Sequence, residues 1–373
     1  MMGKVDFLKD FRDKEKILAI SKLIKKEIDR PINVMEVCGG HTHTIMKYGL
    51  KQLLPQEIDF IHGPGCPVCI MPKERIDHGI VLCQDEKNIL VTLGDMIRVP
   101  GSESSLAKER SKGKNVKMVY SPLDVLKIAQ ENPNKKVIYF AIGFETTTPM
   151  TASVIEKVLE SKMKNVFFHI NHVLVPPPIK AIMESKEAKI DAFIGPSHVS
   201  VITGAKIYKD IVDSYKTPVV VAGFEPVDVM ESILRIVRQF KEGRREVEIQ
   251  YTRAVTWEGN VKAQNLIKKY FEVRDEFRWR GIGDIPFSAL KIKEEFSFLD
   301  AEVVFKDILP NKPIDDHKLC ICGDILKGIA KPYDCKVFGK ACKPENPLGS
   351  CMVSSEGACA AYYKYGNLEV YKQ

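Results

Sequence analysis

Short apolar runs alternate with amphipathic segments along most of the chain. The apolar runs are predicted to form strands at 32–37, 88–93, 136–142, 165–170, 190–194 and 218–222. Between and after them, apolar residues recur with the 3.6-residue period of a helix in 45–54, 122–130, 147–162, 178–185, 202–215 and 227–240. Strands that alternate with helices form parallel sheets with right-handed crossovers, so we expect an α/β fold.

Two pairs of similar segments suggest internal duplication. Residues 59–65 are similar to residues 191–197, and residues 141–145 are similar to residues 221–225. Each segment lies where a strand is expected to end, which is the sheet edge where α/β proteins bind ligands. The pattern predicts two similar Rossmann-like lobes with parallel sheets around a cleft. The alternative is that short glycine turns resemble one another by chance.

The periodic pattern loosens after residue 245. A strand-like run at 246–255 and a helical run at 260–270 precede a turn-rich stretch, and a segment dense in Gly, Pro and Cys follows from residue 320. That segment cannot bury enough apolar surface alone, and a bound metal would supply the missing stabilisation. We expect an α/β lobe over 1–121, a second over 122–245, and a C-terminal region over 246–373 with a smaller Cys-rich domain.

Composition narrows the class of protein. The chain has 373 residues, of which 45% are hydrophobic and 28% charged, as in soluble globular proteins of two or three domains. The net charge is +7, but the basic residues are scattered among acidic ones and form no basic stripe. This distribution argues against nucleic-acid binding. No apolar run is long enough to span a membrane, and residues 1–6 are charged rather than signal-like, so we expect a cytoplasmic protein.

The ten cysteines fall into two groups, four within 38–83 and six within 320–359. In a reducing compartment, metal binding or thiol redox chemistry explains them better than structural disulfides. The C-terminal group comprises Cys320, Cys322, Cys335, Cys342, Cys351 and Cys359. Six thiols exceed a four-ligand site and form no Cys-x2-Cys zinc pairs, so a [4Fe–4S] cluster with two spare thiols is favoured over structural zinc or disulfides.

The N-terminal group surrounds two glycine turns. Cys66 and Cys69 form a Cys-Pro-Val-Cys turn, which is typical of redox-active or metal-binding sites. Cys38 ends a predicted strand and is followed by two glycines, His41 and His43. Together Cys38, Cys66 and Cys69 could form a three-thiolate site for a soft or borderline metal, with the two histidines as cleft residues. Cys83 follows an apolar helical stretch and is expected in the core.

Two further segments offer polar groups near predicted strand ends. Glu145, Thr146 and Thr147 belong to the segment Gly-Phe-Glu-Thr-Thr-Thr-Pro, and Glu225 belongs to Gly-Phe-Glu-Pro. The threonines could bind an anion at a helix start or merely cap the helix, and the glutamates could act as bases or as hydrogen-bond anchors. Further histidines near predicted strand ends are His62, His169, His172 and His198. Each is expected to be buried and hydrogen-bonded, with the alternative that some of them line the cleft. No nucleotide-binding glycine motif follows any predicted strand.

The motifs at 36–43, 63–69, 143–149 and 351–359 together resemble the HypD family of hydrogenase maturation proteins. The resemblance implies a scaffold, rather than a free-standing enzyme, on which the Fe(CN)2CO unit of [NiFe]-hydrogenases is built in a complex with HypC. It further implies that HypE, with HypF, donates cyanide, and that Cys38, Cys66 and Cys69 serve Fe(II).

The C-terminal segment 320–359 with its six cysteines, called the tail below, is also similar to ferredoxin:thioredoxin reductase. That similarity implies cluster ligation by Cys320, Cys335, Cys342 and Cys359, and a redox pair of Cys322 with Cys351. We hypothesise that electrons pass from the cluster through this pair to Cys66 and Cys69. The alternatives are a cluster-dependent thiol-disulfide oxidoreductase, which leaves Cys38 unexplained, and a zinc-stabilised binding module.

Overall fold

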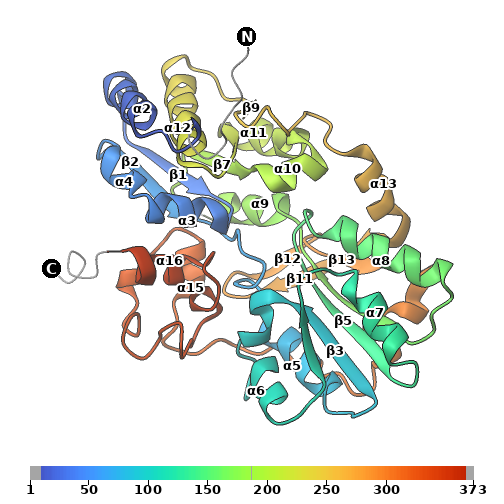
Figure 1. Cartoon of the computed structure of the whole chain (residues 1–373). Coiled ribbons are helices and arrows are strands. Elements are labelled where there is room, and N and C mark those ends of the chain that lie inside the picture. Colours follow the sequence, from blue (N-terminus) through green and yellow to red (C-terminus); the bar gives the residue numbers. More distant parts are fainter. Residues whose placement is uncertain (1–9, 186, 367–373) are drawn as a thin grey trace.

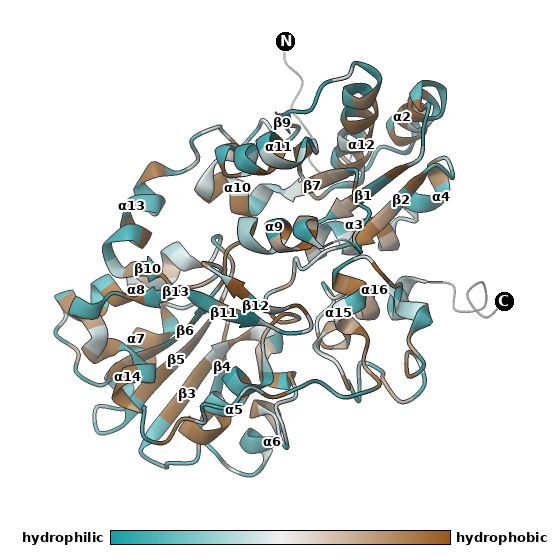
Figure 2. Cartoon of the chain, turned by 180° about the vertical axis from the view of Figure 1, so that it is seen from behind, coloured by the Kyte–Doolittle hydropathy of each residue, from teal (hydrophilic) through white to brown (hydrophobic). Residues whose placement is uncertain are grey.

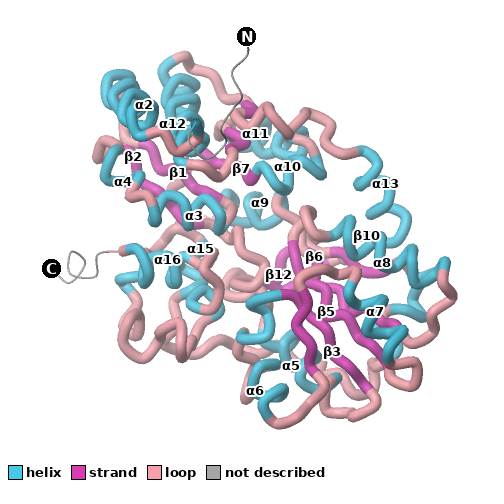
Figure 3. Tube along the Cα trace, in the orientation of Figure 1, coloured by secondary structure: helices cyan, strands magenta, loops and turns pink. Residues whose placement is uncertain are grey.

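The computed structural model describes residues 10–185 and 187–366, so the charged stretch 1–6 lies outside the described residues. The fold is α/β, with two parallel sheets and a cysteine-rich C-terminal region, as Figures 1 and 3 show. The expected fold class is confirmed at this level. No helix in the described ranges is long and apolar enough to cross a membrane.

The first sheet has five parallel strands in the order β2-β1-β7-β8-β9. Its strands are β1 (Ile32–Glu36), β2 (Ile58–His62), β7 (Ala192–Pro196), β8 (Val219–Ala222) and β9 (Val247–Ile249). The helices of this part are α2 (Lys14–Glu27), α3 (Gly39–Lys47), α4 (Leu50–Leu53), α9 (Pro176–Glu184), α10 (Ser197–Thr203), α11 (Lys209–Tyr215) and α12 (Pro226–Lys241). A buried core joins α2 and α12 to β1, β7 and β8.

The second sheet has four parallel strands in the order β4-β3-β5-β6. Its strands are β3 (Asn88–Leu93), β4 (Val116–Val119), β5 (Lys136–Gly143) and β6 (Val166–His172). The helices of this part are α5 (Lys73–Leu82), α6 (Leu106–Ser111), α7 (Asp124–Glu131), α8 (Thr148–Glu160) and α14 (Ala301–Val304). Strand β5 is buried from its second residue to its end, as expected of a strand covered on both faces (Figure 2).

The boundary expected at residue 121 does not separate the two sheets. Residues 1–121 supply strands to both sheets, and so do residues 122–245, because the chain leaves the first sheet after β2 and returns to it at β7. The segments 59–65 and 191–197 end β2 and β7, which flank β1. The segments 141–145 and 221–225 end β5 and β8, which belong to different sheets.

Beyond β9 the chain forms helix α13 (Val261–Tyr270) and two antiparallel strand pairs. These pairs are β10 (Phe271–Val273) with β13 (Leu290–Ile292), and β11 (Glu276–Trp279) with β12 (Gly283–Pro286). The cysteine-rich region contains the short helices α15 (Cys322–Leu326) and α16 (Ala358–Tyr365). The 3-10 turns are Gly94–Arg98, Ala205–Tyr208, Glu294–Leu299, Pro332–Asp334 and Ser350–Met352.

Candidate metal and thiol site

Cys38 follows the carboxyl end of β1 and occupies the N-cap position of helix α3, without a side-chain capping hydrogen bond. Its thiol is buried, and its Sγ lies 3.8 Å from Nδ1 of His198, which follows β7. Burial raises the pKa of the Cys38 thiol well above its ordinary value, and nearby Glu356 adds to this rise. Burial lowers the pKa of His198 to about 4. The pair is therefore a neutral thiol beside a neutral imidazole.

The turn that carries Cys66 and Cys69 packs directly against Cys38. A side chain at Gly65 would place its first carbon 2.2 Å from the Cα of Cys38, so only glycine allows this approach. The amide of Gly39 donates to the carbonyl oxygen of Gly65 at 3.3 Å. Both cysteines of the turn are buried, and the structure joins them in a disulfide. Cys38 and this pair therefore lie on two adjoining turns.

A buried acid that sequence reasoning did not nominate supports the Cys38 turn. Glu36 accepts hydrogen bonds from the amide of Cys38 at 3.1 Å and from the hydroxyl of Thr42. Its other contact is Nδ1 of His62 at 2.5 Å, and Nε2 of His62 lies 3.2 Å from the hydroxyl of Tyr362 on α16. Burial raises the pKa of Glu36. The sequence did offer one signal for Glu36, namely an acidic residue near the end of the apolar run 32–37.

A cleft of about 380 Å³ opens beside these turns. Five segments line it: the turn that carries Cys66 and Cys69, the loop after β3, the loop after β5, the start of α10 after β7, and the C-terminal region. The lining includes Gly65, Pro67, Asp95, Phe144, Thr146, Thr147, His198, Ser354, Ser355 and Glu356. Carboxyl ends of strands from both sheets thus meet at one cleft, as the rule for open α/β sheets predicts.

Glu145 is buried next to the Phe144 and Thr146 side of this cleft. One carboxyl oxygen accepts from the amide of Val175 at 3.0 Å, whereas the other has no hydrogen-bond partner among the described residues. Burial raises the pKa of Glu145 to about 7. The Thr146 hydroxyl is likewise without a partner within the described ranges, but that of Thr147 donates to the Phe144 carbonyl at 3.2 Å. Thr146 rather than Thr147 therefore keeps a polar group available.

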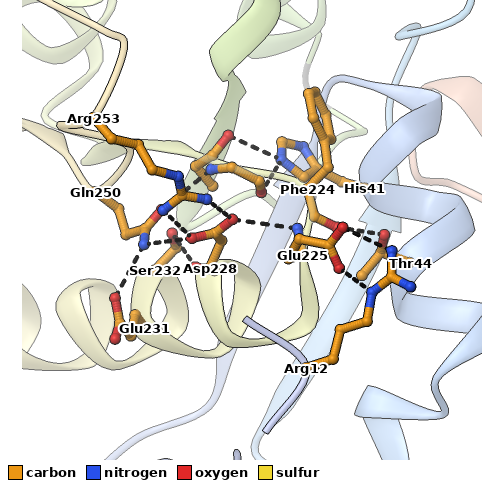
Figure 4. Close-up of polar contacts among 12 residues, drawn as sticks. Arg12, His41, Thr44, Phe224, Glu225, Asp228, Glu231, Ser232, Gln250 and Arg253 are labelled. Carbon is orange, nitrogen blue, oxygen red and sulfur yellow. Dashed lines mark hydrogen bonds and ion pairs between the residues drawn. The ribbon is translucent and has the colours of Figure 1, made fainter. Parts of the chain in front are cut away.

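His41, His43 and Glu225 lie at a neighbouring position. His43 and Glu225 line a second pocket of about 360 Å³. The lining residues that it has in common with the cleft of about 380 Å³ beside the cysteine turns, called the thiol cleft below, are Ser355 and Glu356. Glu225 pairs with Arg12 through two hydrogen bonds of 2.5 and 2.8 Å (Figure 4). Nε2 of His41 lies 3.1 Å from the carbonyl oxygen of Gly223, and burial lowers the pKa of His41 to about 4.

The six C-terminal cysteines line one small cavity, together with apolar side chains such as Val337 and Met352. Cys322 is joined to Cys351 in a disulfide. The thiols of the tail that form no disulfide in the described part of the chain are those of Cys320, Cys335, Cys342 and Cys359. This division matches the partition that the resemblance to ferredoxin:thioredoxin reductase implies.

Four thiols around one cavity fit a cluster of thiophilic metal ions. Burial raises the pKa of Cys359 well above its ordinary value, and repulsion from Cys320, Cys342 and Cys335 adds to the rise. Four thiolates here need compensating cations, and iron ions ligated by thiolates in a [4Fe–4S] cluster would supply them. Cys320, Cys335, Cys342 and Cys359 are the residues that would hold such a cluster.

The tail cavity and the thiol turn are close in space although they are about 280 residues apart in sequence. The hydroxyl of Ser350, next to Cys351, donates to the carbonyl oxygen of Cys69. Arg98, after β3, donates to the carbonyl oxygen of Val353 at 3.1 Å. The remaining cysteine, Cys83, is buried at the end of α5 and its thiol donates to the carbonyl of Ile80 at 3.1 Å, which confirms its expected core position.

The fold and the site define an α/β protein that brings two groups of buried or half-buried cysteines together, as metal-handling and thiol-redox proteins do. The chain belongs to the HypD family: the family model described as "Hydrogenase formation hypA family" matches residues 14–366. The chain is 48% identical over 373 residues to hydrogenase maturation factor HypD2 of Bradyrhizobium diazoefficiens, covering 98% of both chains.

Other curated relatives carry the same designation. The chain is 50% identical over 368 residues to hydrogenase maturation factor HypD of Azotobacter vinelandii, covering 96% of this chain and 97% of the relative. It is 40% identical over 370 residues to hydrogenase maturation factor HypD of Escherichia coli, covering 97% of this chain and 99% of the relative. The suspected family is therefore confirmed over nearly the full length.

Proposed function

We propose that this chain is the iron-binding scaffold on which the Fe(CN)2CO unit of [NiFe]-hydrogenases is assembled. HypC would be its partner in the complex, and HypE, with HypF, would deliver cyanide. The observation that carries the proposal is the meeting of Cys38 with the Cys66–Cys69 turn beside a cleft large enough for an iron with small ligands.

Iron is the cargo in this proposal, and thiolates suit it because they are soft, electron-donating ligands. The Cys66–Cys69 disulfide must first be reduced, which takes two electrons and two protons and yields two thiols. Each thiol then loses its proton as it binds Fe(II). Nδ1 of His198, 3.8 Å from Cys38 Sγ, is placed to accept the proton from that thiol.

The electrons for this reduction would come from the tail. Oxidation of the Cys322 and Cys351 thiols to their disulfide releases the two electrons and two protons that the Cys66–Cys69 disulfide takes up. Because the structure joins Cys322 and Cys351 in a disulfide, that pair must itself first take up two electrons and two protons. A [4Fe–4S] cluster held by Cys320, Cys335, Cys342 and Cys359 would pass these electrons on one at a time from an external one-electron donor. The contact of Ser350 with the Cys69 carbonyl supports this route because it holds the segment of Cys351 against the segment of Cys69.

The polar side of the cleft suits anionic cyanide. Helix α8 begins at Thr148 and directs the positive end of its dipole to this side, next to the Thr146 hydroxyl, which has no hydrogen-bond partner in the described part of the chain. Burial raises the pKa of Glu145 to about 7, so near neutral pH this carboxyl carries less negative charge to repel cyanide than an ordinary glutamate does. Its protonated carboxyl can donate a hydrogen bond, which a carboxylate cannot.

A second candidate function is a thiol-disulfide oxidoreductase of the ferredoxin:thioredoxin reductase type. The disulfide between Cys322 and Cys351 beside four thiols favours it. This candidate needs no iron at Cys38, so iron binding separates the two functions.

The test compares the unmodified protein with Cys38→Ala and with Cys83→Ala as the matched control. Each protein is reduced and loaded with Fe(II) without oxygen, and iron and acid-labile sulfide are then measured. The scaffold proposal predicts iron in excess of sulfide in the unmodified protein and in Cys83→Ala, and loss of that excess in Cys38→Ala. Equal iron and sulfide in all three proteins would support the oxidoreductase instead.

A further inference from the structure

A chain of buried polar side chains joins helix α16, which begins in the tail, to the turn that carries Cys38. Glu36 and His62 are register partners at the ends of the neighbouring strands β1 and β2. Nδ1 of His62 lies 2.5 Å from Oε1 of Glu36, and Nε2 of His62 lies 3.2 Å from the hydroxyl of Tyr362 on α16. All three side chains are buried. The chain of contacts therefore runs from α16 through His62 to Glu36.

The two carboxyl oxygens of Glu36 have different partners. Oε2 accepts from the amide of Cys38 at 3.1 Å, whereas Oε1 contacts His62 and accepts from the hydroxyl of Thr42. Thr42 belongs to α3, the helix whose N-cap is Cys38, but His62 belongs to another strand. Because a carboxyl group is planar, a contact that holds Oε1 also sets the direction of Oε2. His62 therefore fixes, from outside the turn, the group that receives the Cys38 amide.

Tyr362 in turn sets the orientation of the His62 ring. The tautomer with its hydrogen on Nδ1 donates to Glu36 and accepts from the Tyr362 hydroxyl, which gives both ring nitrogens a partner. The rings of His62 and Tyr362 also pack edge to face, with centroids 5.3 Å apart. A change of Tyr362 to phenylalanine would keep this ring contact and remove the hydrogen bond alone.

Helix α16 also packs directly against α3, as Figure 1 shows. A side chain at Gly39 would place its first carbon 2.3 Å from the Cβ of Glu356, just before α16. Further along, the rings of His43 and Tyr365 pack edge to face at 5.2 Å. Cys359 precedes Tyr362 by three residues on α16, a spacing that places both on one helix face. The helix that carries a cysteine of the tail cavity is thus tied to the Cys38 turn.

We propose that Tyr362 and His62 are positioning residues, which hold Glu36, and through it the Cys38 turn, in the geometry that receives iron. The inference rests on the proposed function, because it takes Cys38 to be an iron ligand. Tyr362 acts through His62, and His62 acts through Glu36. Loss of either link loosens the backbone of Cys38 and weakens iron binding there, while every thiol remains in place.

The test is an anaerobic Fe(II) titration of the reduced full chain. The iron bound in excess of acid-labile sulfide is followed, and the value for Cys38→Ala is subtracted as background. Tyr362→Phe is expected to raise the half-saturating Fe(II) concentration about fivefold, as loss of one buried hydrogen bond would, with unchanged sulfide content. Tyr363→Phe is the matched control on the same helix, since the ring of Tyr363 packs against Phe338 instead, and it should bind iron like the unmodified protein.

A double-mutant cycle separates positioning through His62 from a merely structural role. His62→Ala is expected to weaken iron binding about tenfold or more, because it removes the link to Glu36. His62→Gln, whose amide can still donate to Glu36, should recover part of that loss. Tyr362→Phe should weaken binding no further in the His62→Ala background, because Tyr362 acts through His62. Additive effects of the two changes would overturn the proposal.

Equal half-saturating concentrations for Tyr362→Phe and Tyr363→Phe would overturn the proposal and leave the proposed function intact. This comparison decides if His62→Ala does not fold. Loss of sulfide in Tyr362→Phe would also overturn it, since the hydroxyl would then act on the tail rather than on Cys38. An unmodified protein that binds no iron in excess of sulfide contradicts the proposed function, and this inference with it.

Discussion

At the scale of single residues, burial shifts the pKa values of the polar groups near the thiol cleft. Cys38, Glu36 and Glu145 are polar groups near the thiol cleft, and burial raises the pKa of each. The sequence placed Cys38 and Glu145 at strand ends, but their pKa shifts depend on neighbours from distant segments. His198 and Val175 are such neighbours, and neither belongs to a motif with Cys38 or Glu145.

Glu145 gives a prediction for stability against pH. Its pKa is raised from 4.5 to about 7 in the folded protein, so the folded state holds a proton that the unfolded chain releases. The free energy of unfolding should therefore fall as the pH rises through this window. In Glu145→Gln this loss is absent, and the variant should gain up to about 3 kcal/mol relative to the unmodified protein between pH 5 and pH 8.

Denaturant unfolding of the iron-free protein at both pH values measures this difference. Glu103→Gln, at an exposed site, serves as the control and should show no such change. A parallel response of Glu145→Gln and the unmodified protein would mean that Glu145 is ionised in the folded state.

At the scale of elements, a buried polar network fastens α5 and β6 to the segment that leads into the cysteine-rich region. His78 lies 2.9 Å from His169 and 2.8 Å from the carbonyl oxygen of Pro310. Arg75 and Arg274 both pair with Glu302 beside the two histidines. Although His78, His169 and Glu302 are close enough to ligate a metal, the two guanidiniums would repel a cation there.

This network predicts a loss of stability in acid. Burial lowers the pKa of His78 from 6.5 to about 4, so the unfolded chain takes up a proton first as the pH falls through this range. The free energy of unfolding should drop by up to about 3 kcal/mol from this residue. His78→Gln should be less stable at pH 7 but should lose less on acidification, as measured by thermal unfolding between pH 7 and pH 4.

His317→Gln is the matched control, because His317 is exposed and outside the network. It should follow the unmodified protein across the whole range. Equal acid sensitivity of His78→Gln and the unmodified protein would contradict the account.

Elements were largely predictable because their signals are local. The run at 88–93 is strand β3, and the run at 227–240 is helix α12, which spans Pro226–Lys241. The helix expected around 202–215 is confirmed from residue 205 on, as a 3-10 turn that leads into α11, but Gly204, with a φ of 82°, ends α10 before it. His62, His169 and His172 are buried and hydrogen-bonded, as expected. His198 lines the cleft, which was the alternative expected for these histidines.

At the scale of the whole molecule, pairing between distant segments decides the site. The return of the chain to the first sheet at β7 brings His198 to Cys38, and no local pattern predicts which sheet a strand joins. The same holds for the C-terminal region, where Ser350 reaches the Cys69 carbonyl and Tyr362 reaches His62. The cysteine motifs themselves could be recognised from the sequence, because each motif lies within one short stretch of the chain.

The central claim is that iron with cyanide and carbonyl ligands is built on this chain at Cys38. Infrared spectroscopy tests it most directly, on the chain purified without oxygen in complex with HypC from cells that contain the cyanide donors. The account predicts cyanide and carbonyl stretching bands for the unmodified chain and for Cys83→Ala, and their loss for Cys38→Ala. Bands that persist unchanged in Cys38→Ala would contradict it.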